Sequence, residues 1–236
     1  MWLIYLIQVL GTTAMLVHVA VLDLRSREVN DAVWLYYLPL LALVYFQWGS
    51  FSPLVYTYSV VATGMTTYAM YRFSLLGGAD VICATLVGAL NPVTHPFLFP
   101  NLSGRGLEGL TVLLYTAIAI AVAGVLNLGR NFRYTSGLPW FKRLPLAFSG
   151  RRITVEEFLR SKFLFPLTEI TEDGNLKLRT TFSVDEDDSK WRETFRLLLE
   201  QGKIGNDTYI WVAWGVPVLT FMLAAYVFSL MVGLPV

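Results

Sequence analysis

The segment LLGGAD, residues 75–80, places one acidic residue at the head of an apolar run that continues as VICATLV, residues 81–87. A carboxylate at the start of a membrane-length hydrophobic segment is costly, because hydrocarbon cannot solvate its charge, and such a residue usually marks a functional site with a partner. The partner we propose for Asp80 is Asp23, which follows the first apolar run, Trp2 to Leu22. We expect the two aspartates to meet at one face of a membrane.

Composition places the chain among integral membrane proteins. Apolar residues make up 55% of its 236 positions and the mean hydropathy is +0.55, above the usual soluble range. The charges gather in one stretch: 14 of the 18 Lys and Arg lie in residues 130–203, and 12 of the 17 Asp and Glu lie in residues 156–207. This distribution predicts a helical bundle with one polar domain inserted before its last helix.

Several classes of partner and site are disfavoured by the same counts. A formal net charge of +1 and the lack of a basic stripe argue against nucleic acid as a partner. The single cysteine, Cys83, excludes an internal disulfide and any site built from several cysteines. With two histidines far apart in sequence, His18 and His95, we expect no metal site and no cofactor. The N-terminal run lacks a basic start and a small-residue cleavage site, so we expect it to be a retained transmembrane helix.

We predict an all-α polytopic membrane protein with six transmembrane helices, since a bilayer core takes about 20 apolar residues per helix. The predicted spans are residues 2–22, 32–48, 54–75, 79–90, 107–128 and 209–232. The fourth is short, because the prolines that follow it prevent a regular helix. The predicted domains are transmembrane helices one to five in residues 1–128, a cytoplasmic insert in residues 129–207, and helix six in residues 208–236.

Basic residues predict the orientation through the positive-inside rule. Five arginines lie in or beside the odd-numbered connections, whereas the even-numbered connections hold only Arg105. We therefore expect a multi-pass protein of the cell membrane, with both termini outside and the insert in the cytoplasm. Asp23 and Asp80 then fall at the cytoplasmic face and at similar depth, although 57 residues separate them.

The insert is predicted to be a small α+β domain. Its first part is expected to lie along the membrane interface. The segment TVEEF, residues 154–158, is a capping-box pattern that starts a short helix. Two β-rich runs flank EDGN, residues 172–175, which is a hairpin signal. After an acidic cluster at residues 185–188, apolar residues recur at helical spacing from Trp191 to Leu199, and Gly202 suits a C-terminal cap.

Two neighbouring carboxylates can hydrolyse a peptide bond without a covalent intermediate. The ionised one takes a proton from water while the protonated one donates to the carbonyl, and repulsion keeps one proton on the pair. Asp80 lies at a helix N-terminus, where the dipole favours negative charge, and Asp23 lies at a helix C-terminus, so we predict Asp80 as base and Asp23 as acid. We expect Arg25, Gly77 and Gly78 to bind substrate or shape the loops, the glycines by adopting positive φ and by leaving room for an extended chain.

The segment LDLRSREVNDAVW, residues 22–34, resembles the first-aspartate segment of the type IV prepilin peptidase family, in particular its archaeal preflagellin (prearchaellin) peptidase branch. GGAD, residues 77–80, is similar to the second-aspartate segment of these GxGD-type membrane aspartic proteases, and the layout of six spans with an insert before the last is similar too. Two positions depart from the common pattern: Ala79 stands for the second glycine, and Val29 stands where a proline often precedes the asparagine.

The resemblance implies a function. It implies an aspartic endopeptidase that removes the short basic leader from archaellin or type IV pilin-like precursors at the cytoplasmic face, with Asp23 and Asp80 as the catalytic pair and Gly77 shaping the second segment. Bacterial members that also methylate the new N-terminus carry Cys-x-x-Cys pairs, so with one cysteine we expect no methyltransferase activity.

Two other classes of function stay open at this point. Membrane carboxylates also serve as proton relays in transporters, and the short fourth span resembles their discontinuous helices. A non-catalytic assembly scaffold would keep the fold without needing either aspartate. A presenilin-like protease ranks lower, because Leu22 and not a tyrosine precedes Asp23. The sequence names neither the precursor nor the oligomeric state.

Overall fold

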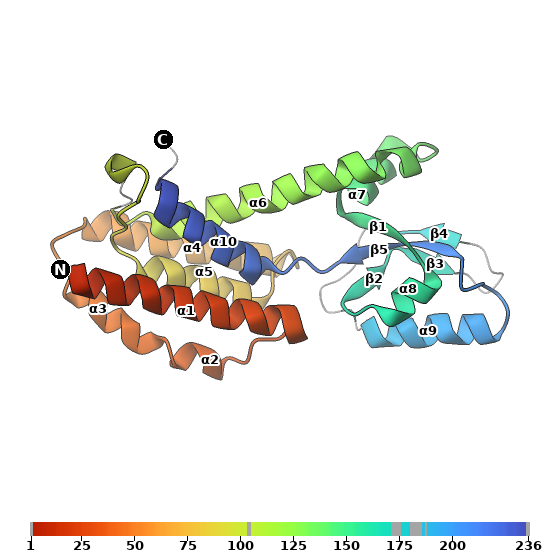
Figure 1. The fold of residues 1–236 in the computed structure, drawn as a ribbon, viewed down its shortest axis with the longest axis horizontal. Coiled ribbons are helices and arrows are strands. Elements are labelled where there is room, and N and C mark those ends of the chain that lie inside the picture. Colours follow the sequence, from red (N-terminus) through yellow and green to blue (C-terminus); the bar gives the residue numbers. More distant parts are fainter. Residues whose placement is uncertain (1, 103–104, 171–175, 180–185, 187, 235–236) are drawn as a thin grey trace. The chain divides into compact units, whose positions relative to one another are not determined.

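The computed structural model describes residues 2–102, 105–170, 176–179, 186 and 188–234. It consists of two compact units, Met1–Ile120 with Pro217–Val236, and Ala121–Val216. The first unit is helical and the second combines helices with two small sheets (Figure 1). The division predicted from the sequence, after residues 128 and 207, stays a prediction.

Helices make up the first unit. Its elements are α1 (Trp2–Ser26), α2 (Ala32–Leu35), η1 (Leu38–Leu41), α3 (Ala42–Tyr45), α4 (Pro53–Arg72), α5 (Gly78–Leu90), η2 (Pro100–Leu102), the first half of α6 (Glu108–Asn131), and α10 (Val218–Val232).

The prediction of six full-length spans is supported only in part. Among the described residues, two helical stretches are long and apolar enough to cross a membrane, Trp2–Ser26 and Glu108–Thr135. Two further apolar helices, α5 and α10, are shorter. The chain is thus mostly helical with a small sheet-containing part, and the count of six spans remains a proposal.

Two of the predicted spans were wrong in their helical extent. Residues 32–48 form the short helices α2, η1 and α3, with Pro39 inside η1, because proline lacks the amide proton that a continuous helix needs. Residues 209–214 form strand β5, and α10 begins only after Pro217. The apolar side chains of residues 209–214 belong to the core of a sheet. The periodicity of apolar residues alone does not distinguish such a buried strand from a buried helix.

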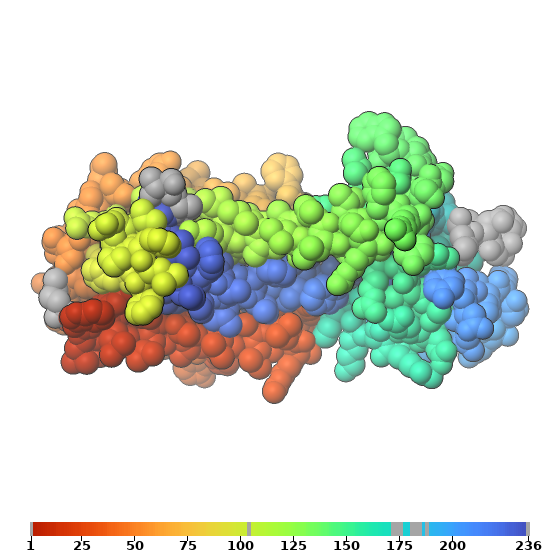
Figure 2. Space-filling model, turned by 45° about the horizontal axis from the view of Figure 1, so that its top comes forward, coloured from red at the N-terminus to blue at the C-terminus, as the bar shows by residue number. Residues whose placement is uncertain are grey.

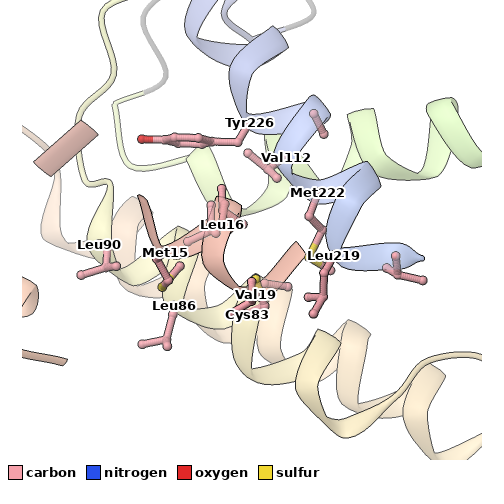
Figure 3. Packing of buried hydrophobic residues seen from close by; sticks show 14 of the residues in the cluster. Met15, Leu16, Val19, Cys83, Leu86, Leu90, Val112, Leu219, Met222 and Tyr226 are labelled. Carbon is pink, nitrogen blue, oxygen red and sulfur yellow. The ribbon is translucent and has the colours of Figure 1, made fainter. Parts of the chain in front are cut away.

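Helices α1, α5 and α10 pack around one apolar core. Figure 3 shows side chains from all three helices converging on this core. The most deeply buried include Met15, Leu16 and Val19 of α1, Cys83, Val87 and Leu90 of α5, and Leu219, Met222 and Tyr226 of α10.

A buried asparagine ties the three helices together at one end of this core. The Asn91 side-chain amide donates to Thr12 Oγ1 over 3.2 Å, and the Tyr226 hydroxyl donates to Asn91 Oδ1 over 2.8 Å. Gln8 adds hydrogen bonds to the Leu90 carbonyl and to Asn91. Because buried polar groups are costly when unpaired, these bonds fix the register of α1 against α5.

Small residues bring α5 and α6 into close contact. A Cβ placed on Gly109 would lie 3.0 Å from the Gly88 Cα and 2.8 Å from the Thr63 Oγ1 of α4. The backbones therefore approach as closely as glycine allows, as in small-residue contacts between membrane helices.

The proline-containing segment after α5 is irregular, as predicted. Its Phe97 and Leu98 amides donate to the carbonyls of Leu230 and Met231 in α10, over 3.0 and 2.8 Å. The His95 ring packs against Tyr5 of α1. Figure 2 shows this segment in yellow between the red start of α1 and the dark blue end of α10.

The second unit is built around an antiparallel three-stranded sheet. The strands are β1 (Gly150–Thr154), β5 (Tyr209–Trp214) and β2 (Leu164–Pro166), in the order β1-β5-β2. Its other elements are the end of α6, η3 (Phe132–Thr135), α7 (Trp140–Ser149), α8 (Val155–Arg160), α9 (Asp188–Glu200), and the paired strands β3 (Thr168–Ile170) and β4 (Leu176–Leu178).

Local signals in the insert predicted its elements well. Thr154 Oγ1 accepts a hydrogen bond from the Glu157 amide, so the capping residue of α8 is confirmed. The pairing of β3 with β4 confirms the hairpin, whose predicted turn, residues 172–175, lies outside the described residues. Helix α9 ends before Gly202, which has φ +68°. Within the acidic cluster, the Glu186 carboxylate pairs with Arg179 at 2.6 Å.

Candidate active site

Asp23 lies in the last turn of α1. Its side chain is 13% exposed, and its Oδ1 lies 3.7 Å from a terminal guanidinium nitrogen of Arg27. The other oxygen, Oδ2, is buried and accepts no hydrogen bond from the described residues. Such groups are rare in folded proteins, because desolvation without a partner costs about 1–3 kcal/mol, and they concentrate where function requires them.

Asp80 lies in the first turn of α5 and is 9% exposed. Its Oδ2 accepts a hydrogen bond from the Gly77 amide at 2.8 Å, and its own amide donates to the Gly77 carbonyl at 3.2 Å. The side chain thereby caps the helix that carries it, as the carboxylate at the third position of a capping box does, and the Gly77 carbonyl takes the place of an N-cap side chain. This bond holds the carboxylate at the N-terminal end of α5.

The register of two helices brings the aspartates together. Asn91 at the end of α5 bonds Thr12 of α1, and the two helices run antiparallel (Figure 1). Eleven residues onward in α1 (12 + 11) is Asp23, and eleven residues back in α5 (91 − 11) is Asp80. At about 1.5 Å per residue, both steps cover about 16 Å. The two carboxylates interact electrostatically at this end of the helix pair.

Arg27 is the cation of the site. It follows the end of α1 with φ +59°, an uncommon conformation for a residue with a side chain, and its amide donates to the Asp23 carbonyl. The side chain is 17% exposed and interacts with the charges of both Asp23 and Asp80. Burial lowers the pKa of the Arg27 guanidinium and the two carboxylates oppose that shift, so arginine remains cationic at neutral pH.

Sequence reasoning did not single out Arg27. It proposed Arg25 as a substrate-binding or loop-shaping residue; Arg25 is exposed and makes no ion pair with a described residue, and its role stays a prediction. The four-residue spacing from Asp23 to Arg27 was the signal available in the sequence, because residues four apart on a helix are neighbours.

The two glycines before Asp80 do not serve to provide a positive φ in the turn. Neither Gly77 nor Gly78 has positive φ, whereas Ser74, in the turn before them, has φ +56°. The expectation that the turn needs glycine for its backbone angles was therefore wrong. A Cβ on Gly77 would lie 3.4 Å from Asp80 Oδ2, so the glycine keeps the carboxylate free of a neighbouring side chain.

Opposing effects act on the protonation of the two aspartates. The helix N-terminus and the Gly77 amide favour the ionised form of Asp80, and its deep burial disfavours it. Asp23 lies at the C-terminal end of its own helix, but Arg27 and the backbone amide of Leu219, in the first turn of α10, favour its ionised form. The assignment of Asp80 as base and Asp23 as acid stays a prediction. Among the described residues, no group of three or more His, Cys, Asp or Glu side chains is arranged to hold a metal ion.

Comparison with known families covers both units. A model of the type IV leader peptidase family matches residues 10–126, the segment that holds Asp23, Arg27 and Asp80. The chain belongs to this family. A model described as the archaeal peptidase A24 C-terminus, type II, matches residues 142–234, which is consistent with the archaeal preflagellin peptidase branch. No curated protein matches the chain. The family is one of proteases that act on precursor proteins.

Proposed function

We propose that this leader peptidase is an aspartic endopeptidase that removes a short basic leader from archaellin or type IV pilin-like precursors at the cytoplasmic face of the membrane. The observation that supports it most is the placement of Asp23 and Asp80 at one end of the antiparallel α1 and α5. We further propose six membrane passages, with both termini outside.

The chemistry needs one proton on the pair. The ionised carboxylate takes a proton from a water molecule as its oxygen attacks the scissile carbonyl carbon, and the protonated carboxyl donates to the carbonyl oxygen. The resulting tetrahedral diol collapses when the carboxyl that took the water proton gives it to the leaving amide nitrogen, the other carboxylate takes a hydroxyl proton from the diol, and the C–N bond breaks. The pair then holds one proton again, so neither aspartate needs a covalent intermediate.

The test of this function is cleavage of a precursor by the full-length protein in lipid vesicles. We expect a precursor with a basic leader to lose that leader, and one whose leader lysines and arginines are replaced by glutamine to be cut at least about tenfold more slowly, because about 1.4 kcal/mol of charge recognition is a factor of ten. The new N-terminus is identified by mass spectrometry. Intact basic-leader precursor after prolonged incubation, with folded protein, would rule the proposal out.

Arg27 is proposed to position and polarise the aspartate pair. With one proton on the pair, two carboxylates and one guanidinium carry no net charge, which suits a site that is mostly buried. The Cys83 thiol of α5 is fully buried in the apolar core. Helix α2 has no titratable side chain, and the one in α10, Tyr226, bonds Asn91.

Replacing Arg27 by glutamine is expected to move the pH profile of cleavage to higher pH by about 1 unit. The cation favours ionised carboxylates, so without it the pair releases each proton at higher pH. Arg27→Lys keeps the charge and is expected to retain the wild-type profile. The measurement is the pH dependence of kcat/KM for all three proteins. If Arg27→Gln and Arg27→Lys lose activity equally at every pH, the role of Arg27 is structural and the proposal for it fails.

A further inference from the structure

Helix α7 exposes an apolar face that the peptidase chemistry does not use. Trp140, Phe141 and Leu144 are exposed, Trp140 to 74%, and their spacing places them along one side of the helix, whereas the Phe148 ring packs against Gly124 of α6. Leu146, on the opposite side, is buried, and so is Ala147. Leu146 joins a small core with Leu167, Trp211 and Ala213. The helix is therefore anchored to the sheet through one side and leaves aromatic residues free on the other.

The surroundings of this face are cationic. Residues 109–155 contain six lysines and arginines and no aspartate or glutamate. Of the six, Arg130, Arg133, Lys142 and Arg143 lie on or beside α7 and the end of α6. The Arg143 guanidinium stacks over the Phe132 ring at 3.8 Å and donates to the Phe132 carbonyl. Charge and aromatic rings therefore occur together, as in helices that lie in the headgroup layer of a bilayer.

The contact of α7 with α6 sets its depth. Asn127 of α6 donates to the Phe148 carbonyl, and Asn131 donates to the Ala147 carbonyl, both over 3.1 Å. Helix α6 lies in the stretch Glu108–Thr135, which is long and apolar enough to span a bilayer. Counting the roughly 20 residues of a bilayer core from Glu108 ends near residue 128. The end of α7 thus lies beside the turns at which α6 leaves the hydrocarbon.

We propose that the exposed face of α7, together with Arg130, Arg133, Lys142 and Arg143, is a membrane-binding surface that inserts into the headgroup layer of an anionic lipid bilayer. The aromatic rings enter the boundary between headgroups and acyl chains, and the four cations bind lipid phosphates. Each basic residue near an anionic surface strengthens the attraction of the helix to that surface. The second unit is then held to the bilayer by α7 in addition to its connections to the membrane helices.

The test uses nitroxide labels on the full-length protein in vesicles. Cysteines replace Phe141, Leu144 and, as a matched control on the exposed side of α9, Glu193, in a Cys83→Ala background. Collision rates with oxygen and with a water-soluble nickel chelate are measured in vesicles of phosphatidylcholine with 30% phosphatidylglycerol. We expect the labels at 141 and 144 to collide at least about threefold less with nickel than the label at 193, and to keep high oxygen accessibility, because oxygen partitions into hydrocarbon.

The charges are tested separately. In anionic vesicles, the double variant Arg133→Glu and Lys142→Glu is expected to raise the nickel accessibility of the label at residue 141 part of the way to that of the label at 193. In pure phosphatidylcholine, the same variant is expected to change the nickel accessibility of this label little. Equal nickel accessibility at residues 141 and 193 would overturn the proposal. Low accessibility to both reagents would also overturn it and assign the face to a protein contact, and dipolar broadening between labels would identify that contact as a second copy of the chain. None of these readings depends on peptidase activity.

Discussion

Asp23→Asn and Asp80→Asn are each expected to lower the rate of precursor cleavage by about 10³-fold or more, with normal expression and folding. Asparagine keeps the size and shape of aspartate but neither takes a proton from water nor carries one to the carbonyl oxygen, and such proton transfers contribute about 10²–10⁴-fold each. The measurement is kcat/KM for leader removal by the full-length variants in vesicles. The double variant is expected to be little slower than either single variant, because residues that act as one unit are not additive.

Asp31→Asn is the matched control. Asp31 follows the same turn after α1, is exposed, and makes no capping hydrogen bond with its side chain, so the same chemical change at this position is expected to leave the rate within about twofold. Wild-type cleavage by either Asp23→Asn or Asp80→Asn would contradict the aspartate pair. It would return the chain to the scaffold or transporter alternatives for these residues.

Gly109→Ala is expected to destabilise the first unit by about 1–3 kcal/mol, although alanine is the better helix former. The added methyl group would lie 3.0 Å from the Gly88 Cα and 2.8 Å from Thr63 Oγ1, so α5, α6 or α4 must shift. A backbone atom is one of the two neighbours, which prevents relief by a rotamer change alone. The measurement is the midpoint of thermal unfolding of the purified protein, followed by tryptophan fluorescence.

Gly129→Ala provides the comparison within the same helix. A Cβ on Gly129 meets nothing within 4 Å, so this change is expected to be neutral or to stabilise by at most about 1 kcal/mol. Equal midpoints for Gly109→Ala and Gly129→Ala would show that the close contact of α5 with α6 does not limit stability. The same pair separates packing from catalysis, since neither glycine lies near Asp23 or Asp80 in sequence.

Local signals in the sequence predicted what local forces decide. Thr154 predicted the start of α8, because its hydroxyl satisfies an amide within three residues. The β-rich runs around residues 172–175 predicted the pairing of β3 with β4, because the two strands of a hairpin are close together in sequence. Asp23 and Asp80 were identifiable because a carboxylate beside a long apolar run is costly wherever the chain folds.

Long-range pairing escaped these signals. Residues 209–214 are apolar enough for a helix, yet they lie between β1 and β2, whose paired residues are 46 to 63 positions earlier in the chain. Backbone hydrogen bonds to those strands decide the conformation, and the residues themselves carry no mark of their partners. The division of residues 32–48 into three short helices likewise depends on how the residues packed around Pro39 accommodate the bend that it causes.

The sequence by itself indicated the candidate catalytic residues and the family of this protein: two aspartates beside apolar helices, a polar insert before the last helix, and the match of both parts to leader peptidase models. The tertiary structure alone decided how those residues are arranged. The bond of Thr12 to Asn91 fixes the register that brings Asp23 opposite Asp80. This register depends on contacts between residues far apart in the chain, and such contacts have no local pattern from which they can be predicted.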